Sequence, residues 1–137
     1  MIKIIYGKKG AGKTKKIIES ANIASETCKG NVAFLFNSKR YICDLKHQVR
    51  FIDTNEYGRK GAYLFLGFIS GLIASNFDLE KIYVDGFLKH MDRPIEELED
   101  LFIRLKPLCE MHRVELILSV SADKDEIPAF MQEFLAD

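Results

Sequence analysis

The chain has 137 residues, the size of one ordinary domain, and its 47% hydrophobic and 29% charged residues are typical of a soluble globular protein. Twenty basic residues balance twenty acidic ones, so the formal net charge is zero. This neutrality argues against a dedicated nucleic-acid-binding protein, because such domains are usually basic. Three scattered cysteines without a C-x-x-C pair, and a start without a signal pattern, predict a cytoplasmic protein.

The amino-terminal half alternates short apolar runs with longer segments of helical spacing. Residues 2–6 (IKIIY) predict a buried strand, and residues 14–28 predict a helix with one apolar face. Residues 31–37 (NVAFLFN) predict a second strand, and residues 50–53 a short third one. Residues 56–75 predict a mostly helical segment whose apolar stretch is too short for a membrane span, which needs about 20 residues.

A fourth strand and another long helix are predicted next. Residues 81–84 (KIYV) form an apolar run that ends at Asp85. Pro94 suits the first position of a helix, where a backbone N–H has no helical partner in any case. Apolar residues then recur at helical spacing, and Pro107 is expected to kink or end this helix.

The last strand is predicted over residues 114–120, before a final helix that Ser121 or Asp123 caps and that runs towards Leu135. Apolar strands that alternate with helices indicate a parallel sheet covered on both faces. The expected fold class is therefore α/β, a three-layer αβα sandwich with a mainly parallel five-stranded sheet. No linker or repeat divides the chain, so residues 1–137 are expected to form one domain.

A glycine-rich loop between the first strand and the first helix carries the strongest motif. It fits G-x-x-x-x-G-K-[ST] through Gly7, Lys8, Lys9, Gly10, Ala11, Gly12, Lys13 and Thr14. Glycines allow backbone N–H groups to point inward around phosphate oxygens, and the following helix adds partial positive charge. Lys13 is expected to reach the phosphates of a nucleoside triphosphate, and Thr14 to offer its hydroxyl to Mg²⁺. A chance match is on the order of 1 in 200 for a chain of this length, and the alternative is a plain connecting turn.

Asp85 is the candidate carboxylate for such a magnesium ion. It ends an apolar strand, and ligands of open α/β sheets bind at the carboxyl ends of strands. We therefore expect Asp85 on the same edge as the glycine-rich loop, where it holds Mg²⁺ together with Thr14. The alternative is an ordinary Asp-Gly turn.

A general base for hydrolysis is not evident. Gly86 follows Asp85, at a position where many ATP-hydrolysing proteins place a glutamate. Other carboxylates near predicted strand ends are more typical of caps or surface charges; they are Asp53, Glu56, Asp92 and Asp123. Hydrolysis is therefore expected to be slow or dependent on a partner.

Two further patterns leave alternatives open. A hydroxyl of Ser119 or Ser121, at the end of a strand beside the first strand, is a candidate sensor of a γ-phosphate; the alternative is that Ser121 or Asp123 caps the next helix. Gly67 and Gly71 form G-x-x-x-G in an apolar helix, which indicates close packing of that helix on the sheet, with a homo-oligomer contact as the alternative.

The segments YGKKGAGKTKK, RYICDLKHQVRFI, YVDGFLK and SVSADKDEIPAFM resemble a group of short bacterial ATP-binding P-loop proteins of undefined role, sometimes labelled twitching motility proteins. The resemblance covers nearly the whole chain. It implies a P-loop NTPase fold, with Asp85 in the Mg²⁺ role and nucleotide binding at Gly7, Gly10, Gly12, Lys13 and Thr14. The strand pattern is also similar to RecA-like and thymidine-kinase-like cores, which implies that residues 114–120 lie between residues 2–6 and 81–84.

Three functions are compatible with these observations. The first is a protein that binds Mg²⁺ and ATP, or another nucleoside triphosphate, hydrolyses it weakly and acts as a switch on a protein partner. The second is a small-molecule or nucleoside kinase. The third is a non-enzymatic interaction module that retains the fold.

Overall fold

One parallel sheet organises the computed structural model, which describes residues 1–58 and 60–136. Within these residues the strands are β1 (Ile2–Gly7), β2 (Asn31–Phe36), β3 (Val49–Asp53), β4 (Leu79–Val84) and β5 (Glu115–Ser121). The helices there are α1 (Lys13–Thr27), α2 (Ala62–Ser75), α3 (Glu99–His112) and the single-turn α4 (Ala129–Gln132). Shorter 3-10 turns occur at Ile42–Asp44, Thr54–Glu56, Phe87–His90, Ile95–Glu97 and Lys124–Glu126.

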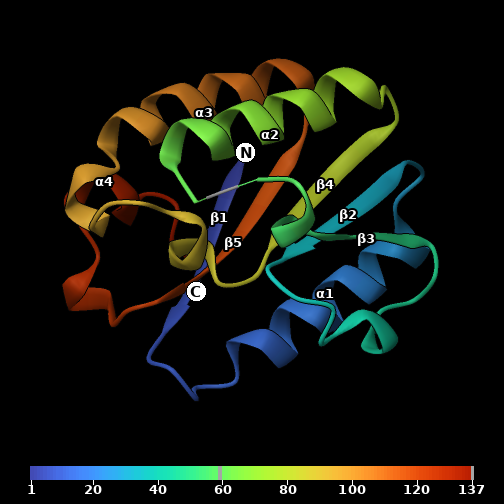
Figure 1. The fold of residues 1–137 in the computed structure, drawn as a ribbon, viewed down its shortest axis with the longest axis horizontal. Helices are drawn as coiled ribbons and strands as arrows, with labels where there is room; N and C mark the ends of the chain where they lie inside the picture. Colours follow the sequence, from blue (N-terminus) through green and yellow to red (C-terminus); the bar gives the residue numbers. More distant parts are fainter. Residues whose placement is uncertain (59, 137) are drawn as a thin grey trace.

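The strand order is β1-β5-β4-β2-β3, and every neighbouring pair is parallel (Figure 1). The predicted α/β class with a five-stranded parallel sheet is thus confirmed for the described residues. The predicted position of the last strand between the first strand and the Asp85 strand is also confirmed. Because all strands run the same way, the segments that follow β1, β4 and β5 emerge at one edge of the sheet.

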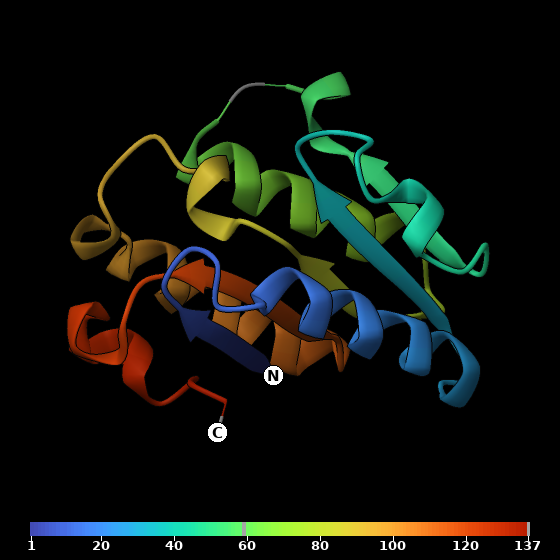
Figure 2. The ribbon, with the colours of Figure 1, turned by 90° about the horizontal axis from the view of Figure 1, so that it is seen from below.

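Helices cover both faces of the sheet, as expected from strands that are apolar throughout. Figure 1 shows α2 and α3 together over one face, and Figure 2 shows α1 over the opposite face. On the α1 side, Ile17 and Ala21 pack with Phe34 and Tyr83 of the central strands. The larger cluster, on the other side, joins buried side chains of α2, α3 and α4 to the alternate strand residues.

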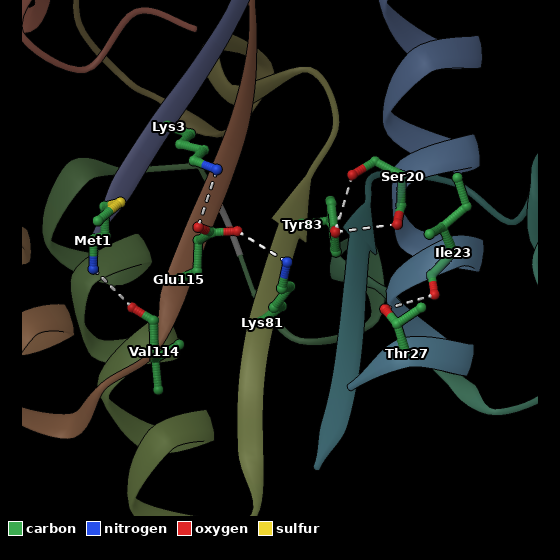
Figure 3. Close-up of polar contacts among 9 residues, drawn as sticks. All are labelled: Met1, Lys3, Ser20, Ile23, Thr27, Lys81, Tyr83, Val114 and Glu115. Carbon is green, nitrogen blue, oxygen red and sulfur yellow. Dashed lines mark hydrogen bonds and ion pairs between the residues drawn. The ribbon is translucent and has the colours of Figure 1, made fainter. Parts of the chain in front are cut away.

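Polar contacts tie neighbouring strands together at the start of the sheet (Figure 3). Glu115 of β5 lies 3.3 Å from Lys3 Nζ of β1 and 3.2 Å from Lys81 Nζ of β4. The hydroxyl of Tyr83 lies 3.1 Å from Ser20 Oγ of α1. These side chains share the α1 face because residues alternate between faces along a strand. The contacts of Glu115 link β1, β5 and β4 near the end of the sheet opposite the glycine-rich loop, whereas Tyr83 links α1 to the carboxyl end of β4.

The helix predicted over residues 56–75 is shorter in the structure, although residue 59 lies outside the described residues. A 3-10 turn follows β3, and α2 begins only at Ala62, whose N–H donates to Asp92 Oδ1 at 3.2 Å. The N–H of Gly61 donates to the His90 carbonyl at 2.9 Å. The start of α2 is fixed by these distant residues, so local periodicity placed it too early.

Gly67 and Gly71 do not serve close packing on the sheet, and that prediction is wrong. Both lie on the exposed face of α2, and a Cβ added at either position would meet no described atom within 4 Å. Among the residues that the structure describes, no helix is long and apolar enough to cross a lipid bilayer, and α2, the most apolar one, has 14 residues.

Pro107 does not end its helix. The helix expected from Pro94 begins later, at Glu99, after a 3-10 turn, and it continues through Pro107 to His112. Proline inside a helix costs about 3 kcal/mol. Leu101, Phe102, Leu105 and Cys109 are buried on both sides of it and hold the helix against the sheet. Pro107 itself lies on the exposed face, where water can hydrate the carbonyl that loses its N–H partner.

The predicted final helix is mostly absent. Asp123 precedes a 3-10 turn and its N–H donates to Glu126 Oε1 at 3.0 Å, but α4 that follows spans only four residues. The chain then turns and bridges β1 in parallel: Ile4 N–H donates to the Phe134 carbonyl at 2.8 Å, and Ala136 N–H donates to the Ile4 carbonyl at 2.9 Å. These bonds satisfy the free edge of β1, which a helix would leave unpaired.

Candidate functional site

The loop after β1 has the backbone that its glycines predict. Gly10 and Gly12 have φ angles of 88° and 86°, in the left-handed region that residues with a Cβ rarely adopt. Gly12 is also the residue before α1, so its left-handed turn leads directly into the helix. The Gly7 N–H donates to the Ala122 carbonyl at 3.0 Å, which anchors the loop to the segment after β5.

Most N–H groups of this loop have no protein acceptor. Ala11 N–H donates to the Lys8 carbonyl at 3.0 Å. In contrast, the N–H groups of Gly10, Gly12, Lys13 and Thr14 form no hydrogen bond to another group among residues 1–58 and 60–136. Unpaired N–H donors at the start of a 15-residue helix form a positively polarised surface that favours an anion.

Lys13 is the buried cation of the loop. Its exposed fraction is 8%, and its Nζ donates to the Lys8 carbonyl at 2.9 Å. Within the described part of the chain, Lys13 forms no ion pair. Buried charges in proteins are usually paired with an opposite charge. The ammonium group is therefore suited to an anionic ligand.

Asp85 lies at the same sheet edge, in contact with the first turn of α1. Thr14 Oγ1 donates to Asp85 Oδ2 at 3.0 Å, although the two residues are 71 positions apart in sequence. Asp85 is 3% exposed, and its own N–H donates to the Leu35 carbonyl at 3.0 Å. The expected juxtaposition of Asp85 and Thr14 is thus present in the structure.

Ser119 supports Asp85 rather than facing the loop. Its hydroxyl donates to Asp85 Oδ1 at 2.6 Å and accepts the Gly86 N–H at 2.7 Å. Ser119 is buried, with an exposed fraction of 2%. Ser121, in contrast, is exposed at the end of β5. The Ser119 hydroxyl therefore contacts Asp85 and Gly86, a supporting role that the sequence patterns did not predict.

A buried histidine extends this network, and sequence patterns gave no sign of it. His90 Nδ1 lies 3.1 Å from the Gly86 carbonyl, and His90 Nε2 lies 3.0 Å from Thr54 Oγ1. Burial lowers the pKa of His90 below its usual value, against the opposing effects of the Gly86 carbonyl and of Asp85. The link from Asp85 to the end of β3 therefore runs through an imidazole whose neutral form is favoured.

The four other candidate carboxylates all have structural partners. Asp53 Oδ1 accepts the N–H of Asn55 at 3.1 Å, and Glu56 pairs with Lys39 at 2.7 Å. Asp92 caps α2 as described above. Asp123 pairs with Lys8 of the loop at 3.2 Å. None of the four contacts Thr14 or Asp85, so each acts as a cap or a surface charge.

The oxygen pair of Thr14 and Asp85 fits a magnesium ion by its spacing. Mg²⁺ binds oxygen at 2.0–2.1 Å in octahedral geometry, so two adjacent ligands lie about 2.9 Å apart. The Thr14–Asp85 separation is 3.0 Å. In the described residues no group of three or more His, Cys, Asp or Glu side chains is placed to hold a metal.

Comparisons with known proteins add nothing to this geometry, since no protein-family model and no curated protein matches the chain.

Proposed function

We propose that this protein has a P-loop NTPase fold and binds a nucleoside triphosphate with Mg²⁺, with ATP as the first ligand to test. The observation that supports the proposal most is the convergence of three anion- and metal-compatible features at one sheet edge. They are the unpaired N–H groups of the loop, the buried Lys13 without a carboxylate partner, and the Thr14–Asp85 oxygen pair.

Each group has a distinct role in this proposal. The loop N–H groups bind non-bridging phosphate oxygens, and Lys13 exchanges its contact with the Lys8 carbonyl for a phosphate oxygen. Thr14 and Asp85 hold the metal, which neutralises phosphate charge when bound. Ser119 keeps Asp85 oriented through its short hydrogen bond.

We further propose that hydrolysis is slow and that the protein is a cytoplasmic nucleotide switch for a protein partner. Gly86 offers no side chain to activate a water molecule. The carboxylates elsewhere at this edge are committed to caps and ion pairs. Turnover of tens of ATP molecules per second by the purified protein would contradict slow hydrolysis without contradicting binding.

Thermal denaturation with ATP, GTP or ADP, each with and without Mg²⁺, tests the binding proposal. A ligand present at 100 times its Kd stabilises the folded state by about 2.7 kcal/mol. We expect Lys13→Ala to abolish this stabilisation. Lys15→Ala is the matched control, because it removes the same charge from an exposed position two residues further along the helix and is expected to retain most of the effect. The proposal would be refuted if nucleotide stabilised both variants equally, or if millimolar Mg-nucleotide did not stabilise the parent protein.

A further inference from the structure

A cavity opens at the same edge of the sheet as the glycine-rich loop, but away from the loop. Its volume is about 590 Å³, within the range of about 300–1,000 Å³ that is typical of small-molecule sites. Its walls come from the end of β2, the segment after β3, the first two turns of α2 and the 3-10 turn at Phe87–His90. No residue from 7 to 14 lines it, and neither does Asp85.

Aromatic side chains form much of the cavity wall. Phe65 is 5% exposed and packs edge-on against Phe87, with 5.4 Å between ring centroids. Tyr57 and Phe68 lie 6.1 Å apart at 45°, and Tyr57 is 57% exposed. Tyr63, at 59% exposed, adds a fourth ring. The ring surfaces that face the cavity can make stacked or edge-on contacts with a flat aromatic ligand.

The charge of the described cavity wall has one sign. Lys60 and Lys89 line it, whereas Asp and Glu are absent from its described lining. Neither lysine forms an ion pair with any described residue. Lys89 Nζ lies 5.5 Å from the centroid of the Phe36 ring. Because the chain as a whole is neutral, two unpaired lysines beside an apolar cavity favour an anionic ligand.

We propose that this cavity binds a small planar aromatic anion, a carboxylate of one or two rings. In this proposal the rings of the ligand lie among Tyr57, Phe65 and Phe68, and the carboxylate of the ligand faces Lys60 and Lys89. The wall also contains His90, whose imidazole contacts Gly86 next to Asp85, so the cavity adjoins the candidate nucleotide site without sharing its residues. The inference does not depend on nucleotide binding.

Calorimetric titration with 2-naphthoate tests this site, and 2-naphthamide is the neutral control of the same shape. We expect 2-naphthoate to bind at least tenfold more tightly than the amide, and Lys60→Met combined with Lys89→Met to remove that preference. Tighter binding of the carboxylate that persists in the double variant would overturn the assignment of the lysines.

Two glycines of α2 provide a matched pair for locating the ligand. Gly67 lines the cavity and Gly71 does not, while a Cβ at either would meet no described atom within 4 Å. Both Gly67→Met and Gly71→Met are expected to fold, because replacing a helical glycine favours the helix. We expect Gly67→Met to weaken 2-naphthoate binding at least tenfold and Gly71→Met to change it less than twofold.

The result that overturns the proposal is equal 2-naphthoate affinity in both glycine variants, or no binding to the parent protein at millimolar concentration. Repeating the titration with Lys13→Ala separates the two proposals. The aromatic anion is expected to bind that variant as it binds the parent, whether or not the nucleotide proposal holds.

Discussion

The glycine-rich loop and the aromatic cavity lie on one edge of the same sheet, yet they are built in opposite ways. The loop is one continuous stretch, shaped by the backbone angles of Gly10 and Gly12, and the distant Asp85 contacts the helix turn that follows it. The cavity is assembled from three separate stretches of the chain, and its residues follow no motif. A site made by backbone geometry leaves a local signature in sequence, whereas a site made by packing does not.

The two sites also differ in how they contribute to stability. The loop residues from Lys8 to Gly12 are exposed and bury little apolar surface. The floor of the cavity is continuous with the main hydrophobic core through Phe65 and Phe87. Substitutions in the loop should therefore change ligand binding and leave the fold intact, whereas substitutions in the cavity floor should change both.

The largest effect is expected from Phe65→Ala. Removing a buried phenylalanine typically costs about 3–5 kcal/mol of unfolding free energy, through lost burial and the void that remains. Tyr63→Ala, at the exposed rim of the same cavity, is expected to cost less than about 1 kcal/mol. Urea denaturation of the two variants measures the difference. A cost below 1 kcal/mol for Phe65→Ala would mean that the cavity floor is not part of the core.

Asp85→Asn addresses the metal half of the candidate nucleotide site. The amide keeps the size of the side chain but loses the charge that favours Mg²⁺. We expect Mg²⁺ to enhance ATP binding 10- to 100-fold less than in the parent protein, by analogy with the loss of groups around metal sites. Calorimetry with and without Mg²⁺ measures this ratio. An unchanged ratio would remove Asp85 from the metal site.

Ser119→Ala tests the support beneath Asp85. The substitution leaves the Gly86 N–H without its acceptor, and we expect a loss of about 1–2 kcal/mol of unfolding free energy. Ser121→Ala removes an exposed hydroxyl from the same strand and should cost less than about 0.5 kcal/mol. Equal costs, measured by chemical denaturation, would show that the Ser119 hydroxyl does not hold the Asp85–Gly86 turn.

The smallest expected effect is the pH dependence of stability that arises from His90, which lines the cavity and contacts Gly86 next to Asp85. Burial lowers the pKa of His90, so the unfolded state binds a proton at a higher pH than the folded state. Stability from the neutral imidazole is thus complete above about pH 6.5 and declines as pH falls below it, with a slope of at most about 1.4 kcal/mol per pH unit. His90→Gln should flatten the dependence of Tm on pH between 7.5 and 5. If the Tm of the variant depends on pH as steeply as the Tm of the parent protein, titratable groups other than His90 cause the dependence.

The sequence predicted those parts of the molecule that local chemistry controls. The strand runs, the glycine-rich loop and the placement of Asp85 beside Thr14 follow from apolar periodicity and from the common direction of parallel strands. The start of α2 depends on Asp92, which is distant in the sequence. The continuation of α3 through Pro107 depends on the packing of its buried side chains against the sheet. His90 and the cavity were missed for the same reason, since neither has a spacing that distinguishes it from ordinary core residues.

The position of β1 at the border of the sheet has a consequence for synthesis on the ribosome. β1 is translated before the other described strands, but its strand partner is β5, and the bonds on its other side come from residues 134–136. The Gly7 anchor likewise waits for Ala122. A growing chain that has been synthesised only as far as α3 therefore lacks the partners that hold β1 and the glycine-rich loop in place. If the proposed nucleotide binding holds, fragments released before residues 115–136 are made would not compete for nucleotide.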